Sequence, residues 1–98
     1  MLTLKFRSTL WRYAGPGGWH FITLPVKHAA TIKALLRSPR RGWGSLSVTA
    51  TIGSSSWKTS IFPEKKSKSY LLPVKADVRK TESIGDGDTV AVTLEVAM

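Results

Sequence analysis

Residues 45–63, SLSVTATIGSSSWKTSIFP, decide the fold class of this chain. Their first half alternates strictly between apolar and small polar residues, which is the period of a strand with one buried face. The apolar members of this alternation are Leu46, Val48, Ala50 and Ile52. Residues 53–55, Gly-Ser-Ser, are typical of a turn, and residues 56–62 return as a second strand. The stretch therefore predicts an antiparallel hairpin in a mainly β protein.

The returning strand raises the question of which side chains face the core. By alternation Trp57 lies on one side, whereas Lys58, Ser60 and Phe62 lie on the other. If Trp57 faces the core, Lys58 and Ser60 point outward as a pair of donors for an anion. If Phe62 is buried as well, a bulge or bend must separate it from Trp57. Such a bend would bury both aromatic side chains, and the strand is expected to end at Pro63.

The N-terminal third adds a hairpin and a helix. Residues 2–11 alternate like a half-buried strand, residues 14–18 (AGPGG) form a loop, and residues 19–24 (WHFITL) form a second strand. Pro25 then precedes apolar residues at helical spacing. We expect one amphipathic helix over about residues 26–37 that covers one face of the sheet.

The C-terminal third alternates turns with short elements. We expect a charged turn, a strand, a short helix, a second turn and a last strand, at residues 64–68, 69–74, about 75–81, 85–88 and 90–96. Strands this close in sequence leave no room for crossover helices between most neighbours, which favours antiparallel pairing. The expected fold is mainly β: a small closed or double-split antiparallel β-barrel, formed by residues 1–98 as a single domain.

Charge is distributed unevenly along the chain. The sequence has 15 Lys and Arg against 6 Asp and Glu, which gives a formal net charge of +9. All the acidic residues lie within residues 64–98, so residues 1–63 are basic and free of acids. Such a segment attracts polyanions, and nucleic acid is the first candidate among them. Alternatively, it is only a soluble basic surface.

Several kinds of chemistry are excluded or lack support in the sequence. The chain has no cysteine, which excludes disulfides, thiolate metal sites and cysteine nucleophiles. The turn at residues 85–88 lacks the oxygen ligands of a calcium loop, and residues 15–18 lack the ending of a phosphate-binding loop. His20 and His28 lie in the acid-free segment, His28 on the exposed side of the predicted helix. We therefore predict no catalytic residue, no metal site and no cofactor.

The N-terminus has no recognisable targeting segment. Its apolar residues are interrupted by Lys5, Arg7 and Arg12. They therefore form neither the apolar region of a signal peptide nor a membrane span. A cytoplasmic location is the expectation.

A second basic cluster follows the predicted helix. Arg40 and Arg41 stand beside Trp43 on a glycine-rich loop. Two guanidinium groups next to an aromatic ring could hold a phosphate while the ring stacks on a base. Alternatively, Trp43 is buried as an apolar anchor, because a large apolar area favours burial.

Three blocks of the sequence resemble a known prokaryotic family. They are residues 53–63 (GSSSWKTSIFP), residues 70–80 (YLLPVKADVRK) and residues 87–92 (GDTVAV). Together with shorter matches near the N-terminus, they make nearly the whole chain similar to the family DUF1905, a domain of unknown function. The resemblance implies a double-split β-barrel, grouped by shape with AbrB-type transcription regulators and MazE-type antitoxins. It implies no activity, since a shared fold does not carry function.

We interpret the chain as a non-enzymatic binding module for an anionic partner, with nucleic acid first. The residues assigned to this site are Lys58, Ser60, Lys75, Arg79, Arg40 and Arg41. The basic side chains would hold phosphate oxygens, and Ser60 would donate a hydrogen bond. Alternatively, Lys75 and Arg79 only pair with nearby acids such as Asp77 and Glu82.

Two other functions remain open. One is a small-ligand receptor or an enzyme whose pocket lies inside the barrel, lined by Trp57, Tyr70 and Arg79. The other is an accessory or oligomerisation domain that acts as a homo-oligomer.

Overall fold

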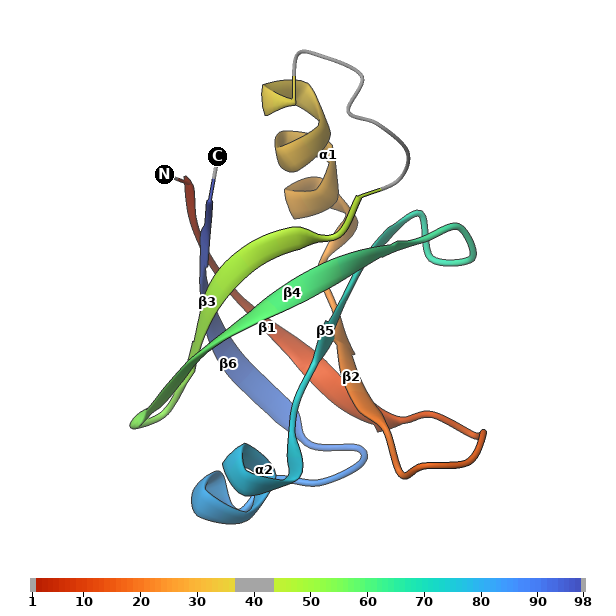
Figure 1. Cartoon of the computed structure of the whole chain (residues 1–98), viewed down its shortest axis with the longest axis vertical. Helices are drawn as coiled ribbons and strands as arrows, with labels where there is room; N and C mark the ends of the chain where they lie inside the picture. The colour runs from red at the N-terminus through yellow and green to blue at the C-terminus, as the bar shows by residue number, and fades with distance from the viewer. Residues whose placement is uncertain (1, 37–43, 98) are drawn as a thin grey trace.

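The computed structural model describes residues 2–36 and 44–97. It contains six strands and two helices in the order that the sequence predicted (Figure 1). They are β1 (Leu2–Arg12), β2 (His20–Thr23), α1 (Val26–Leu35), β3 (Leu46–Ile52), β4 (Ser55–Glu64), β5 (Ser69–Pro73), α2 (Ala76–Glu82) and β6 (Thr89–Val96). The short helix α2 follows the predicted range closely, with Lys75 as its N-cap.

The predicted hairpin forms β3 and β4. Their register runs from Leu46 opposite Ile61 to Ile52 opposite Ser55, which leaves a two-residue connection. Gly53 opens this connection with φ 58, a conformation that glycine adopts without steric cost. All four apolar residues of the β3 alternation are buried, so the hairpin supplies one inner wall of the core.

All strand pairs are antiparallel, and they close a barrel in the order β1-β2-β5-β4-β3-β6. The two longest strands each serve two neighbours. β1 pairs with β6 over residues 2–9 and with β2 over residues 10–12. β4 pairs with β3 over residues 55–61 and with β5 over residues 62–64. The predicted closed antiparallel barrel is confirmed, and along β1 and β4 the paired neighbour changes partway along the strand.

Simple alternation holds along β4. Ile61 is fully buried and Trp57 is half-buried, whereas Lys58 and Phe62 are exposed, Phe62 to 45%. The bend that would have buried Trp57 together with Phe62 is therefore absent from this described strand. The face of β4 that carries Ile61 packs into the core, and Phe62 lies on the outer face.

The expectation that Pro63 ends the strand is wrong. β4 continues through Pro63, which lies opposite Tyr70, as far as Glu64. Proline is tolerated in a strand where its missing N–H is not needed by a neighbouring strand. The described pairing with β3 stops at Ile61, so this condition is met at position 63.

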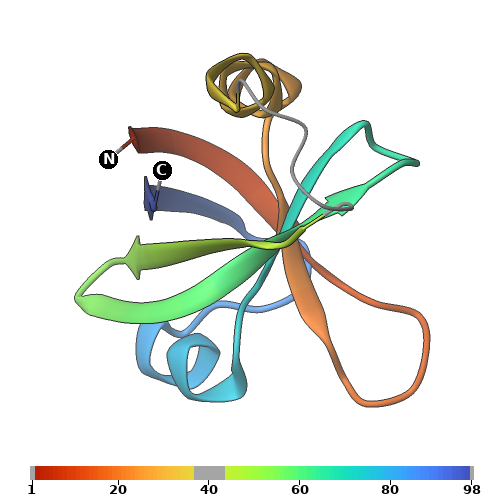
Figure 2. The same ribbon diagram turned by 45° about the horizontal axis from the view of Figure 1, so that its top comes forward.

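Helix α1 lies at one end of the barrel and α2 at the other in both views (Figures 1 and 2). The sequence predicted instead that the first helix covers a sheet face. Ala29 and Ile32 are its buried residues, whereas Leu35 is 49% exposed. α1 begins at Val26 as predicted and ends at Leu35, and residue 37 lies outside the described residues.

His28 does not lie on an exposed side of α1 as the sequence suggested. It is half-buried, and its ring centroid lies 5.5 Å from that of Phe6 on β1. The difference follows from the position of the helix, because a helix across a barrel end contacts more than one strand.

Candidate functional site

The barrel wall opens between β4 and β5. These strands pair over residues 62–64 and 69–71 only. Toward its N-terminus β4 stays paired with β3, while β5 toward its C-terminus stays paired with β2. The last contact on that side is Val74 N–H, which donates to His20 O at 3.0 Å. Because the two strands follow different neighbours, they diverge and leave a gap.

A cavity of about 400 Å³ lies in this gap. Its chemistry comes mainly from six residues: Trp19, His20, Trp57, Lys58, Lys75 and Arg79. We call this cavity the split pocket. Its size is at the lower end of the range of about 300–1,000 Å³ that holds small ligands in proteins.

The direction of the backbone groups along β4 follows from Tyr70. The Tyr70 carbonyl accepts a hydrogen bond from Leu24 N–H at 3.0 Å, so the backbone groups of Tyr70 face β2. Tyr70 and Pro63 are therefore a pair without ladder bonds between them. Since backbone groups alternate in direction along a strand, those of Ser60 and Lys58 face β5 across the gap. The Lys58 amide is thus a donor directed at the split pocket.

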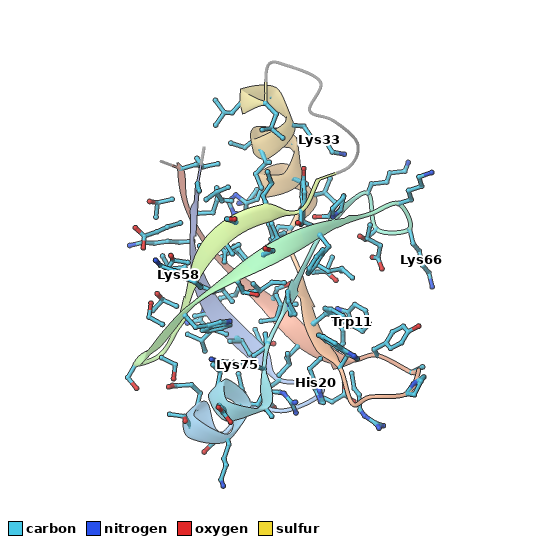
Figure 3. The ribbon with its side chains drawn as sticks, viewed as in Figure 1. Trp11, His20, Lys33, Lys58, Lys66 and Lys75 are labelled. Atoms are coloured by element: carbon cyan, nitrogen blue, oxygen red, sulfur yellow. The ribbon has the colours of Figure 1, made fainter. Side chains whose placement is uncertain are left out.

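Three basic residues reach the split pocket from two segments. Lys58 comes from β4, and Lys75 and Arg79 lie four positions apart at the start of α2 and one turn later. In Figure 3, Lys75 lies at the lower end of the barrel beside α2, near His20, and Lys58 lies higher on the β4 side. Lys58 and Lys75 are exposed, and Arg79 is half-buried.

The Arg79 side chain is held in place by the backbone. Its Nε donates a hydrogen bond to the Val74 carbonyl at 3.2 Å. This bond uses only Nε. It therefore holds the side chain in place and leaves the two terminal nitrogens of the guanidinium group for other acceptors. A fixed guanidinium loses less conformational entropy when it binds an anion in a two-point manner.

Three acids of the C-terminal part of the chain accept hydrogen bonds from hydroxyl or backbone N–H groups. Glu82 accepts hydrogen bonds from Ser55 Oγ at 2.6 Å and from Ser54 Oγ at 3.2 Å. The bond from Ser55 is the main cause that lowers the pKa of the Glu82 carboxyl. In the C-terminal turn, Asp86 accepts from Arg12 N–H at 2.9 Å and Asp88 accepts from Gly85 N–H at 2.8 Å. These carboxylates therefore serve hydroxyl and amide donors.

The structure separates the residues that the sequence assigned to the site. Lys58, Lys75, Arg79 and Trp57 line the split pocket together. The Ser60 side chain is half-buried on β4 and is not part of the lining. Tyr70 is buried in the core, where burial raises the pKa of its hydroxyl. Arg40 and Arg41 lie outside the described residues.

The sequence did not indicate that the first hairpin loop contributes to the site. Gly17, Gly18, Trp19 and His20 all line the split pocket. A hydrogen bond of 2.7 Å joins His20 Nδ1 to the Gly18 carbonyl, so Nδ1 carries the proton and Nε2 is left for another partner. The glycine-rich loop predicted only a turn, because its proximity to residue 74 depends on the register of β2 and β5.

Residues 2–36 and 44–97 contain no group of three or more His, Cys, Asp or Glu side chains that could hold a metal ion. Neither of the two described helices is long and apolar enough to cross a membrane.

The fold and the pocket define a class of protein: a small six-stranded antiparallel barrel with a basic pocket where its wall divides. The family model described as Domain of unknown function (DUF1905) matches residues 6–94. The chain belongs to the DUF1905 family, which confirms the resemblance seen in the sequence. No curated protein matches the chain.

Proposed function

We propose that this protein is a non-enzymatic binding module that holds an anionic partner in the split pocket, with nucleic acid first. One observation supports this most strongly: Lys58, Lys75 and Arg79 come from two segments into one cavity. Glu82, which follows Arg79 on α2, accepts hydrogen bonds from the hydroxyl groups of Ser54 and Ser55. Lys58 and Lys75 are exposed and Arg79 is half-buried, so an anion that enters the pocket could reach these cations.

The pocket suits a phosphodiester group. Arg79 would form two parallel hydrogen bonds with phosphate oxygens, which its planar guanidinium group favours. Lys75 would add a second positive charge from the N-cap of α2, and the Lys58 amide would add a neutral donor. None of these contacts depends on the base, so binding at this pocket is expected to be independent of sequence.

The charge of the whole chain supports nucleic acid over a compact acidic ligand. The formal net charge is +9, and residues 1–63 contain no acid. A positive field over most of the chain attracts a polymer of phosphates more strongly than a single anion. A small-anion receptor is the second candidate, because the cavity of about 400 Å³ is large enough for a phosphorylated metabolite.

A salt titration tests the proposal. Labelled duplex DNA and single strands are titrated by fluorescence anisotropy between about 50 and 200 mM salt. If Lys58, Lys75 and Arg79 each neutralise one phosphate, the slope of log K against log salt should be about −2.7 on duplex DNA or about −2.1 on a single strand. Absence of binding near 50 mM salt, or a slope near zero, would refute the proposal. Competition by inorganic phosphate with no binding of either polymer would favour the small-anion receptor.

A charge-matched pair of variants assigns the binding to the pocket. The double variant Lys75→Gln/Arg79→Gln should bind nucleic acid at least about tenfold more weakly. The magnitude of its salt slope should fall by about 1.4 on a single strand or about 1.8 on duplex DNA. The control is Lys27→Gln/Lys33→Gln, which removes the same charge from exposed positions on α1 at the other end of the barrel. Equal losses in the two variants would mean that the chain binds through general charge alone.

A further inference from the structure

The outer face of β1, β2, β4 and β5 carries a groove of about 990 Å³ whose lining is dominated by five aromatic side chains. They are Trp11, Tyr13, Trp19, Phe21 and Phe62, and we call this the aromatic groove. Their position follows from strand alternation, because Leu10 and Ile22, next to Trp11 and Phe21, are fully buried on the inner side. A contiguous apolar patch on the surface of a monomer usually marks an interaction site.

The rings are arranged around Phe21. Trp19 is nearly parallel to Phe21, with an interplanar angle of 6° and centroids 6.0 Å apart. Trp11 is tilted against Phe21 at 5.3 Å, and Tyr13 meets it edge-on at 6.4 Å. Trp19 is nevertheless 56% exposed and Tyr13 47% exposed. Trp19 thus packs against Phe21 in an offset parallel arrangement while more than half of its surface stays exposed, which suits a stacking platform.

The rim of the groove is mainly basic. Arg12 and Lys66 line it and are exposed, and Glu64 is the acid of the lining. Figure 3 shows Trp11 and Lys66 on the same side of the barrel, away from α1. An aromatic surface with a basic rim is complementary to planar bases joined by phosphates. A purely apolar protein partner would leave both cations without a counterpart.

The groove is continuous with the split pocket. Trp19, Thr59 and Pro73 line both cavities. A strand whose phosphates are held by Lys75 and Arg79 would therefore pass its neighbouring nucleotides over Trp19. The bases of a duplex are already stacked inside the helix and cannot reach such a platform, whereas those of a single strand can.

We propose that the aromatic groove stacks the bases of a single-stranded nucleic acid whose phosphates occupy the split pocket. The inference rests on the proposed function and adds to it the class of polymer. The phosphates supply affinity that depends on salt, and the rings supply affinity that depends on the presence of bases.

The test separates bases from phosphates. The probes are a thymidine strand of about 12 nucleotides and an abasic deoxyribose-phosphate strand of equal length, each titrated at the same series of salt concentrations. The thymidine strand should bind at least about tenfold more tightly, since each stacked base contributes about that factor. The salt slopes of the two strands should agree, because they carry the same number of phosphates.

Variants then locate the preference. Phe62→Ala changes a residue that lines the aromatic groove and is not part of the split pocket lining, and Trp19→Ala removes the platform. Both should lower the affinity for the thymidine strand toward that of the abasic strand, with little change in salt slope. The control Val26→Ala truncates an exposed apolar side chain on α1 and should keep the full preference. Lys75→Gln/Arg79→Gln should weaken both strands equally.

Each outcome bears on one proposal or both. Equal affinity of the wild-type protein for the two strands, with a normal salt slope, overturns base stacking and leaves the proposed function standing. Absence of binding to either strand overturns both. Sedimentation gives an independent check, because a dimer that Phe62→Ala dissociates, without a base preference, would mean that a second copy of the chain covers the groove.

Discussion

Two seams of the barrel differ in how completely they are closed. The seam between β1 and β6 is paired along residues 2–9 and 89–96, and its register runs without a break. The seam between β4 and β5 is paired only over residues 62–64 and 69–71. Prolines stand at or beside this short pairing, at positions 63 and 73, and Pro73 removes a backbone donor that would face β4. The first seam is built for stability, and the second leaves a cavity that basic residues surround.

The closed seam should be the more sensitive to loss of packing. Leu94 is fully buried on β6, opposite Leu4 on one side and Ala50 on the other. Leu94→Ala should lower the free energy of unfolding by about 2–5 kcal/mol, because it leaves a cavity in the core. Urea unfolding measures this change. The control Thr93→Ala alters the outer face of the same strand and should cost far less, and similar losses would show that the seam is not specially packed.

Narrowing the open seam should weaken binding with little effect on stability. Residues 69 and 71 bond to β4, and by alternation a donor at position 73 would also face β4. Pro73→Val supplies that donor opposite Ser60, so the strands can pair one step further. A ligand must then break a bond of about 0.5–1.5 kcal/mol, which predicts about two- to twelvefold weaker binding of the single strand.

Pro63→Val is the matched control for this experiment, because its restored N–H faces away from β5 and adds no bond across the gap. Hydrogen exchange should show a protected amide at position 73 in the first variant. Unchanged binding together with a protected amide would mean that the ligand does not enter the gap.

The smallest expected effect concerns the contact that joins α2 to the β3–β4 hairpin. Glu82 accepts hydrogen bonds from Ser54 and Ser55, and its folded pKa is lowered mainly by the Ser55 bond. A lowered folded pKa gives stability that is fully present above the unfolded pKa of about 4.3 and lost as pH falls through the folded value. Glu82→Gln should therefore melt at a slightly lower temperature than the wild-type protein at neutral pH. This difference in melting temperature should disappear in acid.

Thermal melts at pH values from about 7 down to about 3 measure this difference, which should be on the order of a few degrees at most. A difference in melting temperature that stays constant over the whole pH range would mean that the carboxylate charge plays no part. The Asp77→Asn variant, at an exposed position on the same helix, serves as the charge control.

The sequence predicted the elements well because each has a local cause. The alternation in residues 46–52, the glycine at 53 and the helical spacing after Pro25 all act within a few residues. The order of strands and helices and the closed antiparallel barrel were correct for this reason. The expected bend after Trp57 failed because the sequence alone did not show that Phe62 has an aromatic surface to join on the outside.

The candidate site was predicted in part. Lys58, Lys75, Arg79 and Trp57 were named from the sequence and line one pocket. The side chain of Ser60 and that of Tyr70 lie elsewhere, and Gly18 of the first hairpin loop and His20 at the start of β2 were missed. Membership of the pocket depends on the register between β5 and β2, and β2 lies far from β4 and β5 in the chain.

The sequence by itself determined the strands, the two helices, the excess of basic charge and the family, because propensity, alternation and charge are properties of short segments or of composition. Only the tertiary structure decided that β4 leaves β5 beyond Phe62 and that Lys58 shares a pocket with Lys75. It also decided that the aromatic side chains of three strands meet on one outer face. The physical reason is that strand register is fixed by long-range hydrogen bonds and core packing, which no local pattern encodes.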